Sequence, residues 1–286
     1  MRPMLTDPGY IKELLARHGF RFSKALGQNF LVASWVPEDI AASAALDESC
    51  GVVEVGPGIG CLTRELAERA GKVVSVELDN SLQPILKETL ADVDNVKIVF
   101  GDVLKEDLAA LTQRELPGMR LHMCANLPYN VTTPVLTAAI KSGLFESITV
   151  MIQREVARRI CSRPNTADYG AFGVFCQWHC EPELLFDVPP SCFMPQPKVT
   201  SSVIRLKRRE VPPCSVQDEK LMDRIVRAAF NQRRKTLANA LISQLGLSRQ
   251  QAEQAIAQAG FDTRIRGEVL DIGGFAKISD QIGSIM

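Results

Sequence analysis

The chain has 286 residues, of which 46% are hydrophobic and 23% are charged, and its formal net charge at pH 7 is zero. This composition is typical of a globular protein with one large and one small domain, or with two domains. The sequence contains neither an apolar run long enough to span a bilayer nor the apolar core of a secretory signal. We therefore expect a cytoplasmic protein without a membrane partner.

The zero net charge hides an uneven distribution along the chain. The formal charge is −8 over residues 38–153, but +3 over residues 1–37, +4 over residues 154–209 and +1 over residues 210–286. Zero net charge argues against a nucleic-acid-binding protein, whereas basic flanks around an acidic core fit a polyanion that is held from the edges. Solvated surface charge explains the same pattern equally well.

Eight cysteines are present, and none forms a Cys-x-x-Cys pair; they are Cys50, Cys61, Cys124, Cys161, Cys176, Cys180, Cys192 and Cys214. Without a secretory signal, reduced thiols are the simplest interpretation. The stretch Cys176-Gln-Trp-His179-Cys180 contains metal-ligand residue types, but its spacing matches no standard zinc pattern and a second ligand pair is missing. We expect buried thiols and no metal.

Two short helices are predicted before the first strand, at residues 8–18 and 37–46. In the first of these helices, apolar residues recur on one face and charged residues on the other. Residues 21–31 lie between the helices. They are basic, aromatic and interrupted by glycine, and they predict an ordered loop.

A strand, a glycine loop and a helix follow. The predicted strand spans residues 51–55, the loop is Gly56-Pro57-Gly58-Ile59-Gly60, and the helix spans residues 61–69. Glycines in such a loop let the backbone approach a nucleotide closely in a doubly wound sheet. The spacing lacks a glycine of the dinucleotide-binding fingerprint, which counts against a dinucleotide oxidoreductase. A plain tight turn is the alternative interpretation.

Alternating strands and helices continue along the chain and predict an α/β protein with a Rossmann-like sheet and helices on both faces. Further strands are predicted at residues 72–76, 96–100, 121–125 and 148–152, and segments of β-like composition at 172–179, 184–188 and 201–206. The intervening helices are predicted at residues 81–91, 133–141 and 153–160.

Two predicted strands end in acidic residues. Glu77 follows the strand at 72–76, about twenty positions after the glycine loop, where doubly wound folds bind a ribose diol. Asp102 follows the strand at 96–100, and its side-chain oxygens can accept from an adenine amino group. Either residue alone would be read as a helix cap or a surface charge. Together they predict a ligand crevice.

The strand at 121–125 runs into Asn126-Leu127-Pro128-Tyr129. Pro128 fixes its own φ and disfavours helical geometry at Leu127, so the loop is stiff. Its amide, carbonyls and aromatic ring make a poor general base but can hold a flat ring that carries an amino group. A strand-to-helix turn with a buried tyrosine is the alternative for these four residues alone. The neighbouring crevice favours a ligand site.

The C-terminal part of the chain has a different pattern. Residues 210–215 resemble a linker, and from residue 218 onward the pattern is helical. The helices are predicted at residues 218–230, 234–244, 248–259 and 266–270, followed by a helical tail. We therefore assign residues 1–209 to an α/β domain, with residues 1–37 as its N-terminal segment, and residues 210–286 to a small all-α domain.

The ordered motifs resemble those of the ribosomal RNA adenine dimethyltransferases that act on small-subunit rRNA, whose bacterial members confer sensitivity to kasugamycin. Each motif is weak or moderate alone, but the ordered set is specific and covers nearly the whole chain. The motifs are Gly27-Gln28-Asn29-Phe30-Leu31, Glu54-Val55-Gly56-Pro57-Gly58-Ile59-Gly60, Glu77-Leu78-Asp79, Gly101-Asp102, Asn126-Leu127-Pro128-Tyr129, Gln153-Arg154-Glu155-Val156-Ala157 with Arg159, Phe193-x-Pro195-x-Pro197-Lys198-Val199-x-Ser201 and Arg233-Arg234-Lys235-Thr236-Leu237.

The resemblance implies a Rossmann-like, S-adenosylmethionine-dependent methyltransferase, with residues 1–209 as its catalytic domain and residues 1–37 as a cofactor- and RNA-binding segment. It implies dimethylation of N6 of two adjacent adenosines in a loop near the 3′ end of small-subunit rRNA, coupled to subunit biogenesis. The implied cofactor is S-adenosylmethionine, with S-adenosylhomocysteine as product and no metal. The cofactor-binding residues that the matching motifs imply are Asn29, Leu31, Gly56, Glu77, Asp102 and Asn126, together with Gln28, Glu54, Gly58, Gly60, Leu78 and Val103.

The chemistry needs alignment more than acid–base catalysis, because the donor is a strong electrophile and the adenine amine a weak nucleophile. We expect the Asn126 side-chain oxygen and the Leu127 carbonyl to accept both N6 hydrogens, with Pro128 as the brace. Tyr129 and Phe193 are expected to stack on the two faces of an unstacked base. The side chains expected to contact rRNA phosphates are Arg21, Lys24, Arg154, Arg158, Arg159, Lys198, Arg205, Lys207, Arg208, Arg233, Arg234 and Lys235.

Two alternatives use the same fold: a large-subunit rRNA adenine methyltransferase of the macrolide-resistance type, and a non-catalytic ribosome-assembly factor. The long N-terminal segment and the loop from Phe193 to Ser201 favour the small-subunit family. Intact cofactor motifs favour an enzyme. We expect a monomer whose partner is rRNA in the assembling small subunit, with its ribosomal proteins present.

Overall fold

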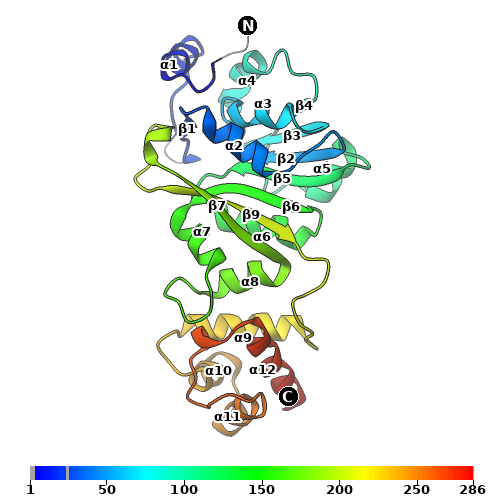
Figure 1. The fold of residues 1–286 in the computed structure, drawn as a ribbon, viewed down its shortest axis with the longest axis vertical. Helices are drawn as coiled ribbons and strands as arrows, with labels where there is room; N and C mark the ends of the chain where they lie inside the picture. Colours follow the sequence, from blue (N-terminus) through cyan, green and yellow to red (C-terminus); the bar gives the residue numbers. More distant parts are fainter. Residues whose placement is uncertain (1–3, 24–25, 286) are drawn as a thin grey trace. The chain divides into compact units, whose positions relative to one another are not determined.

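A computed structural model describes residues 4–23 and 26–285 of the chain (Figure 1). The chain divides into two compact units. Unit 1 contains the chain up to Ala157 and the segment Glu183–Arg208, and unit 2 contains Arg158–Pro182 and the chain from Arg209 onward. Unit 1 ends at Arg208, whereas the expected boundary is residue 209, and residues 158–182, which include the first residues of a strand of the sheet, belong to unit 2.

Unit 1 is built on one mixed sheet of seven strands. In order across the sheet they are β4 (Val96–Phe100), β3 (Lys72–Glu77), β2 (Cys50–Val55), β5 (Arg120–Asn126), β6 (Ser147–Gln153), β9 (Ser201–Arg208) and β7 (Cys180–Val188). The first five strands are mutually parallel, and β9 pairs antiparallel with β6. The strand order reverses between β2 and β5, and at such a switch point the carboxyl ends of the strands leave a ligand crevice.

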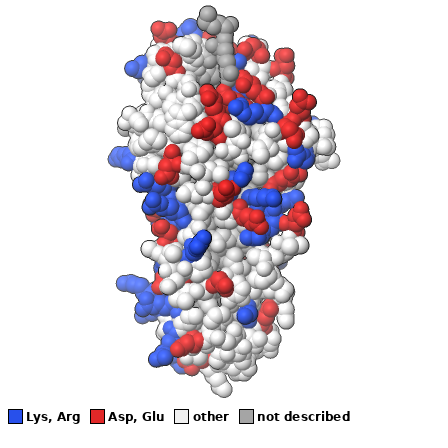
Figure 2. All heavy atoms as spheres, in the orientation of Figure 1, with Lys and Arg blue, Asp and Glu red and all other residues white. Residues whose placement is uncertain are grey.

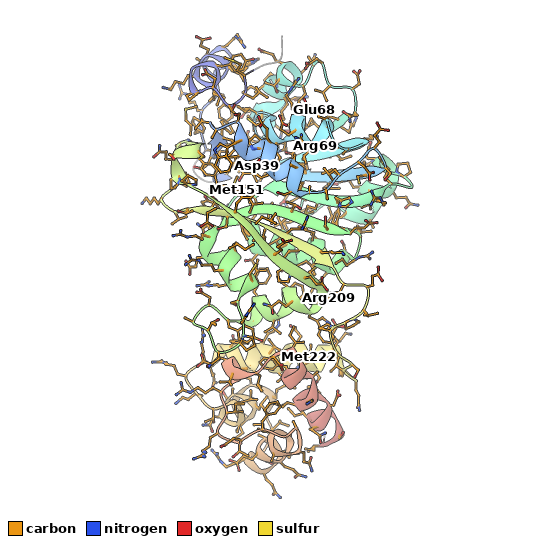
Figure 3. All side chains as sticks on the ribbon, viewed as in Figure 1. Asp39, Glu68, Arg69, Met151, Arg209 and Met222 are labelled. Carbon is orange, nitrogen blue, oxygen red and sulfur yellow. The ribbon has the colours of Figure 1, made fainter. Side chains whose placement is uncertain are left out.

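Helices pack on both faces of this sheet. On one face, α2 (Trp35–Ser43) and α3 (Cys61–Ala67) share a hydrophobic core with Val52 of β2 and Met151 of β6 (Figure 3). On the opposite face, α5 (Leu108–Glu115) ends at Leu116, which lies so close to β2 that a Cβ on Gly51 would be 3.1 Å from it. The expected α/β architecture with helices on both faces is confirmed.

Helix α5 is absent from the elements predicted from sequence. Its start is local: the Asp107 carboxylate accepts hydrogen bonds from the Ala109 and Ala110 amides. The helix is short, and only Leu108, Leu111 and Thr112 of it are buried. A short helix with so few buried positions gives little periodic signal.

Further helices and two short strands complete unit 1. They are α1 (Pro8–Arg17), β1 (Phe30–Leu31), η2 (Asn80–Leu82), α4 (Gln83–Thr89), α6 (Thr132–Ser142), α7 (Arg154–Cys161, which continues into unit 2), η3 (Pro190–Cys192) and β8 (Phe193–Met194). Helix α1 begins at Asp7, which caps the Tyr10 amide, and its apolar face packs against Ile85 and Leu86 of α4.

Unit 2 is helical. Its elements are α8 (Ala171–His179), α9 (Glu219–Asn231), α10 (Leu237–Leu245), α11 (Arg249–Gln258), η4 (Gly267–Val269) and α12 (Ile272–Ile285). The α-helices share one hydrophobic core that includes Phe275 and Met222, of which Met222 is labelled in Figure 3. Element η4 packs so tightly on α9 that a Cβ on Gly267 would lie 2.4 Å from Ala229.

The strand predicted over residues 172–179 is wrong, because this segment is helix α8. Its aromatic and apolar residues have β-like composition, but they are spaced for a helix. Val174 and Trp178, four residues apart, face the core of unit 2, and the Phe172 and Phe175 rings stack three residues apart. Packing on one helical face outweighed the β-propensity of the individual residues.

Two further observations concern the whole described chain. Among residues 4–23 and 26–285, no helix is long and apolar enough to cross a membrane. The eight cysteines are free, and the described part of the chain holds no group of three or more Cys, His, Asp or Glu side chains placed to bind a metal ion.

Candidate active site

The site begins at the switch point, where the glycine loop follows β2. Gly56 and Gly58 have φ values of 72° and 59°, in the left-handed region that favours glycine. The Gly56 amide donates to the Val76 carbonyl at 2.9 Å, and the Gly58 amide lies 3.4 Å from Glu77 Oε2. The loop therefore turns back over the end of β3, with its backbone facing the crevice.

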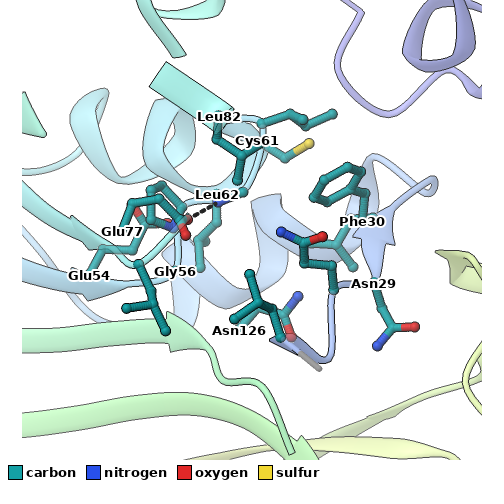
Figure 4. Close-up of a pocket in the computed structure, with 16 residues that line it drawn as sticks. Asn29, Phe30, Glu54, Gly56, Cys61, Leu62, Glu77, Leu82 and Asn126 are labelled. Carbon is teal, nitrogen blue, oxygen red and sulfur yellow. Dashed lines mark hydrogen bonds between the residues drawn. The ribbon is translucent and has the colours of Figure 1, made fainter. Parts of the chain in front are cut away.

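A pocket opens above this loop (Figure 4). Nine of the twelve residues predicted to bind a cofactor line it: Gln28, Asn29, Leu31, Glu54, Gly56, Gly58, Glu77, Leu78 and Asn126. The other lining residues were missed by sequence reasoning, and they are Leu26, Phe30, Pro57, Ile59, Cys61, Leu62 and Leu82. Most of these are apolar, and a periodic apolar pattern does not distinguish a pocket wall from a core position.

Glu77 stands at the end of β3 with its carboxylate oriented by the backbone. Its Oε1 accepts from the Asp79 amide at 2.8 Å. Burial raises the pKa of Glu77, while the Asp79 and Gly58 amides act in the opposite direction. A carboxylate has about four acceptor positions, so Glu77 keeps capacity to accept from ligand hydroxyls.

Glu54 is more deeply buried, with a relative exposure of 1%. Its Oε2 accepts from the Thr63 hydroxyl at 2.7 Å and the Ser75 hydroxyl at 2.6 Å. Burial raises the pKa of Glu54 to about 7, the two hydroxyls lower it, and the charge of Glu77 raises it further. The pocket therefore has beneath it a carboxyl group that titrates near neutral pH.

Three predicted cofactor residues lie outside this pocket. Gly60 starts α3 with a φ of 91°, and a Cβ there would lie 3.2 Å from Leu90, so its role is to let the helix pack. Asp102 and Val103 follow β4 beside the end of β3, where the Gly101 amide donates to the Glu77 carbonyl at 2.8 Å. The Asp102 carboxylate caps the Leu104 amide at 3.0 Å.

The N-terminal segment closes one side of the pocket. Gln28 donates from Nε2 to the Asp79 carboxylate at 2.6 Å and accepts from the Ser23 amide at 2.9 Å. Its side chain thus fastens the segment to the turn after β3. The Asn29 amide group donates to the Gly27 carbonyl at 2.9 Å. The predicted RNA contact Lys24 lies outside the described residues.

Asn126 ends β5 and lines two cavities at once. It borders the pocket above the glycine loop and also a second, smaller cavity of about 20 Å³, and Asn29 is the other residue common to both. Within the described part of the chain, the side-chain amide of Asn126 makes no hydrogen bond to another protein group. Both cavities therefore meet at an amide whose donors and acceptor are available to ligands.

The small cavity contains the residues predicted to hold a base. Its walls are Gly27, Asn29, Asn126, Leu127, Pro128, Tyr129 and Phe193. The Leu127 amide donates to the Met151 carbonyl of β6 at 3.1 Å, which fixes where the loop leaves the sheet. A volume of about 20 Å³ holds little more than one water molecule, so a purine requires the walls to separate.

The two predicted stacking rings differ in exposure. Tyr129 is partly buried, and its hydroxyl lies 2.8 Å from Ser201 Oγ. Burial raises the pKa of the Tyr129 phenol. Phe193 is only 3% exposed and belongs to the hydrophobic core beside α2, although its ring also reaches the small cavity.

Several predicted RNA-contacting cations have structural partners. Arg205 pairs with Glu183 at 2.6 Å and donates to the Ser43 carbonyl, and Arg208 donates to the Gly143 carbonyl. Arg154 lies 3.8 Å from Asp187. Arg233 pairs with Glu268 and donates to the Thr166 and Ala167 carbonyls.

The remaining described cations of that set have exposed side chains, and they are Arg21, Arg158, Arg159, Lys198, Lys207, Arg234 and Lys235. Figure 2 shows lysine and arginine side chains interspersed with acidic ones over the face in view. Arg154 and Arg208 are exposed as well, and Arg159 also has an interaction partner, so exposure and partnering do not divide the predicted set into two groups.

Comparison with solved structures supports the fold. The 23S rRNA methyltransferase ErmE is 27% identical with a TM-score of 0.69, covering 89% of this chain and 99% of its own. A dimethyladenosine transferase from Plasmodium falciparum, 22% identical, has the same fold with a TM-score of 0.73, covering 87% of this chain and 95% of its own.

Sequence relatives are more similar. A protein named ribosomal RNA small subunit methyltransferase A from Geobacillus thermodenitrificans is 45% identical over 99% of this chain and 98% of its own length. A protein of the same name from Clostridium perfringens is 46% identical over 96% and 95%. The sequence model described as ribosomal RNA adenine dimethylase matches residues 19–278. With this match over most of its length, and with these relatives, the chain belongs to the ribosomal RNA adenine dimethylase family.

Proposed function

We propose that the chain is an S-adenosylmethionine-dependent enzyme that dimethylates N6 of two adjacent adenosines in a loop near the 3′ end of small-subunit rRNA. The observation that carries this proposal is the position of Asn126, which lines both cavities and has no hydrogen-bond partner among the described residues. An amide at the junction of two sites suits a reaction in which a group passes from one bound molecule to another.

The residues of the larger pocket fit S-adenosylmethionine. The Glu77 carboxylate can accept from ribose hydroxyls, and the glycine loop presents backbone without side chains at Gly56 and Gly58. Asp102, beside the end of β3, is the candidate partner for the adenine amino group. When bound, the cofactor supplies an electrophilic methyl group on a positively charged sulfur.

The protein's contribution is to orient the acceptor. The lone pair of an adenine amino group is delocalised into the ring, so transfer requires that the amine be held in one geometry. The Asn126 side-chain oxygen can accept one N6 hydrogen, and the Leu127 carbonyl is the candidate acceptor for the other. Tyr129 and Phe193 supply aromatic walls for a base that has left its stack.

The small-subunit substrate is favoured over the alternatives by the relatives. The proteins that are 45% and 46% identical carry small-subunit names, whereas ErmE, at 27% identity, is a 23S rRNA methyltransferase. The available amide at Asn126 favours an enzyme over a purely structural assembly factor. We further propose that the chain acts in the cytoplasm as a monomer on assembling small subunits, with ribosomal proteins present.

The test is methyl transfer from labelled S-adenosylmethionine to purified small and large ribosomal subunits, followed by mapping of the modified nucleotides. The proposal predicts dimethyladenosine at adjacent positions of small-subunit rRNA. Label confined to large-subunit rRNA would support the macrolide-resistance type of activity instead. Binding to small subunits without any transfer would support the assembly factor.

A further inference from the structure

The Tyr129 hydroxyl is tied to a residue outside the predicted catalytic set. It lies 2.8 Å from Ser201 Oγ, and either oxygen can be the donor. Tyr129 stands on the loop after β5, whereas Ser201 is the first residue of β9. The hydrogen bond therefore joins the small cavity to a strand that enters the sheet from another part of the chain.

Ser201 is a rigid anchor. Its relative exposure is 0%, and its backbone pairs with Gln153 at the end of β6. The next residue, Ser202, is equally buried, and its hydroxyl donates to Asp187. Because side chains alternate along a strand, Ser201 points toward the opposite face of the sheet from Ser202.

The anchored ring is a wall of the small cavity. Tyr129 lines that cavity but does not line the larger pocket, and Ser201 lines neither. The cavity must widen to admit a purine. Without the hydrogen bond to Ser201, the Tyr129 ring could rotate about its two side-chain torsions into the space that the base has to occupy.

We propose that Ser201 is a positioning residue for the methyl-transfer reaction, whose hydroxyl holds the Tyr129 ring in one orientation as a fixed stacking wall for the target adenine. The inference rests on the proposed function and adds a residue to it. A simpler role for Ser201 is to give the partly buried Tyr129 hydroxyl a hydrogen-bond partner. That role requires no particular orientation of the Tyr129 ring. The two roles differ in what they predict for catalysis.

A fixed wall contributes to the transfer step and not to cofactor binding. Ser201→Ala should therefore lower kcat about two- to tenfold, the range expected for the loss of one neutral hydrogen bond, and leave KM for S-adenosylmethionine unchanged. Tyr129→Phe keeps the ring, removes the hydroxyl and should have the same effect. The double variant should be no slower than either single variant, because both remove the same bond.

The matched control is Ser202→Ala, which removes a buried serine hydroxyl from the adjacent position of the same strand. It should leave kcat near the wild-type value. The proposal would be overturned if the losses of kcat in Ser201→Ala and Tyr129→Phe multiplied in the double variant, because the two substitutions would then act independently. An equal loss in Ser202→Ala would also overturn it, because that would indicate a general weakening of β9.

A spectroscopic measurement separates this inference from the proposed function. The chain has three tyrosines, so NMR of protein labelled with ¹³C in the tyrosine rings resolves each ring, and Tyr129→Phe assigns the signal. We expect the Tyr129 signal to shift in Ser201→Ala and to stay in place in Ser202→Ala. An unchanged Tyr129 signal in Ser201→Ala would show that Ser201 does not hold the Tyr129 ring. Failure of the wild-type protein to methylate small-subunit rRNA would instead refute the proposed function.

Discussion

Phe30 pairs with Met194 in a two-stranded antiparallel sheet that joins the N-terminal segment to the proline-rich loop before β9. The Phe30 ring also packs on the glycine loop, because a Cβ on Gly58 would lie 3.3 Å from it. Three motifs that are far apart in the sequence are thus held together around the larger pocket.

The packing of Phe30 on the glycine loop predicts the effect of Gly58→Ala. The new methyl group would push against the Phe30 ring, and alanine at a φ of 59° is strained by about 1–2 kcal/mol. We expect affinity for S-adenosylmethionine to fall at least tenfold in calorimetry. Gly246→Ala is the control, because Gly246 also has a positive φ, of 74°, but its Cβ would meet nothing within 4 Å. Equal affinities in the two variants would argue against a cofactor site at this loop.

The raised pKa of Glu54 predicts how stability depends on pH. Between the ordinary pKa of 4.5 and the folded-state value of about 7, the folded protein binds more protons at Glu54 than the unfolded chain does. The free energy of unfolding should therefore fall as pH rises through this window, by up to about 3 kcal/mol from this residue.

Denaturant unfolding of wild type and Glu54→Gln between pH 4.5 and 8 measures this contribution. The glutamine oxygen can still accept from Thr63 and Ser75, so the variant removes the titration without removing both hydrogen bonds. We expect the stability of Glu54→Gln relative to wild type to increase with pH. A difference that stays constant across the window would show that Glu54 does not titrate there.

The same carboxyl group should distinguish the cofactor from its product. S-adenosylmethionine carries a positive sulfur that favours ionised Glu54, whereas S-adenosylhomocysteine carries none. Near pH 7, cofactor binding should release more protons than product binding. Calorimetry in two buffers with different ionisation enthalpies counts these protons. The difference should disappear in Glu54→Gln, and equal proton release by both ligands in wild type would contradict the expectation.

Alanine substitutions of two adjacent arginines in unit 2, Arg233 and Arg234, should have different effects. Arg233 pairs with Glu268 and donates to the Thr166 and Ala167 carbonyls, so Arg233→Ala should lower the melting temperature. Arg234 is exposed, and no described residue bonds to its side chain. Arg234→Ala should leave the melting temperature unchanged and reduce the salt dependence of rRNA binding by about one unit of slope. A lower melting temperature in Arg234→Ala and a lower salt dependence in Arg233→Ala would mean that Arg234 stabilises the fold and Arg233 contacts rRNA.

The sequence predicted the positions of residues that have an unusual backbone conformation or a polar side chain at the end of a strand. The glycine loop, Glu77 at the end of β3 and Asn126 at the end of β5 were all placed correctly at one edge of the sheet, because short strands that end in such residues are distinctive. Each of these signals is local in the chain.

Features that depend on tertiary packing were not predictable in this way. The helix α8 was read as a strand because its aromatic residues outweighed its helical spacing. The partners of Arg205 and Arg233 lie in distant segments, so a basic residue that stabilises the fold could not be told from one available to RNA. From the sequence, the motifs of Tyr129 and Ser201 were linked only through the Phe193 ring, and the hydrogen bond from Tyr129 to Ser201 had no local signal.

The central claim is that Asn126 holds the adenine amine where the two cavities meet. The direct measurement is the single-turnover rate of methyl transfer to small-subunit rRNA by Asn126→Ala, at saturating cofactor and subunit so that weaker binding does not contribute. Circular dichroism and thermal unfolding establish that the variant is folded. We predict a rate at least about 100-fold below wild type, as is typical when an aligning polar group is lost from an active site. A rate within a few-fold of wild type would contradict the claim.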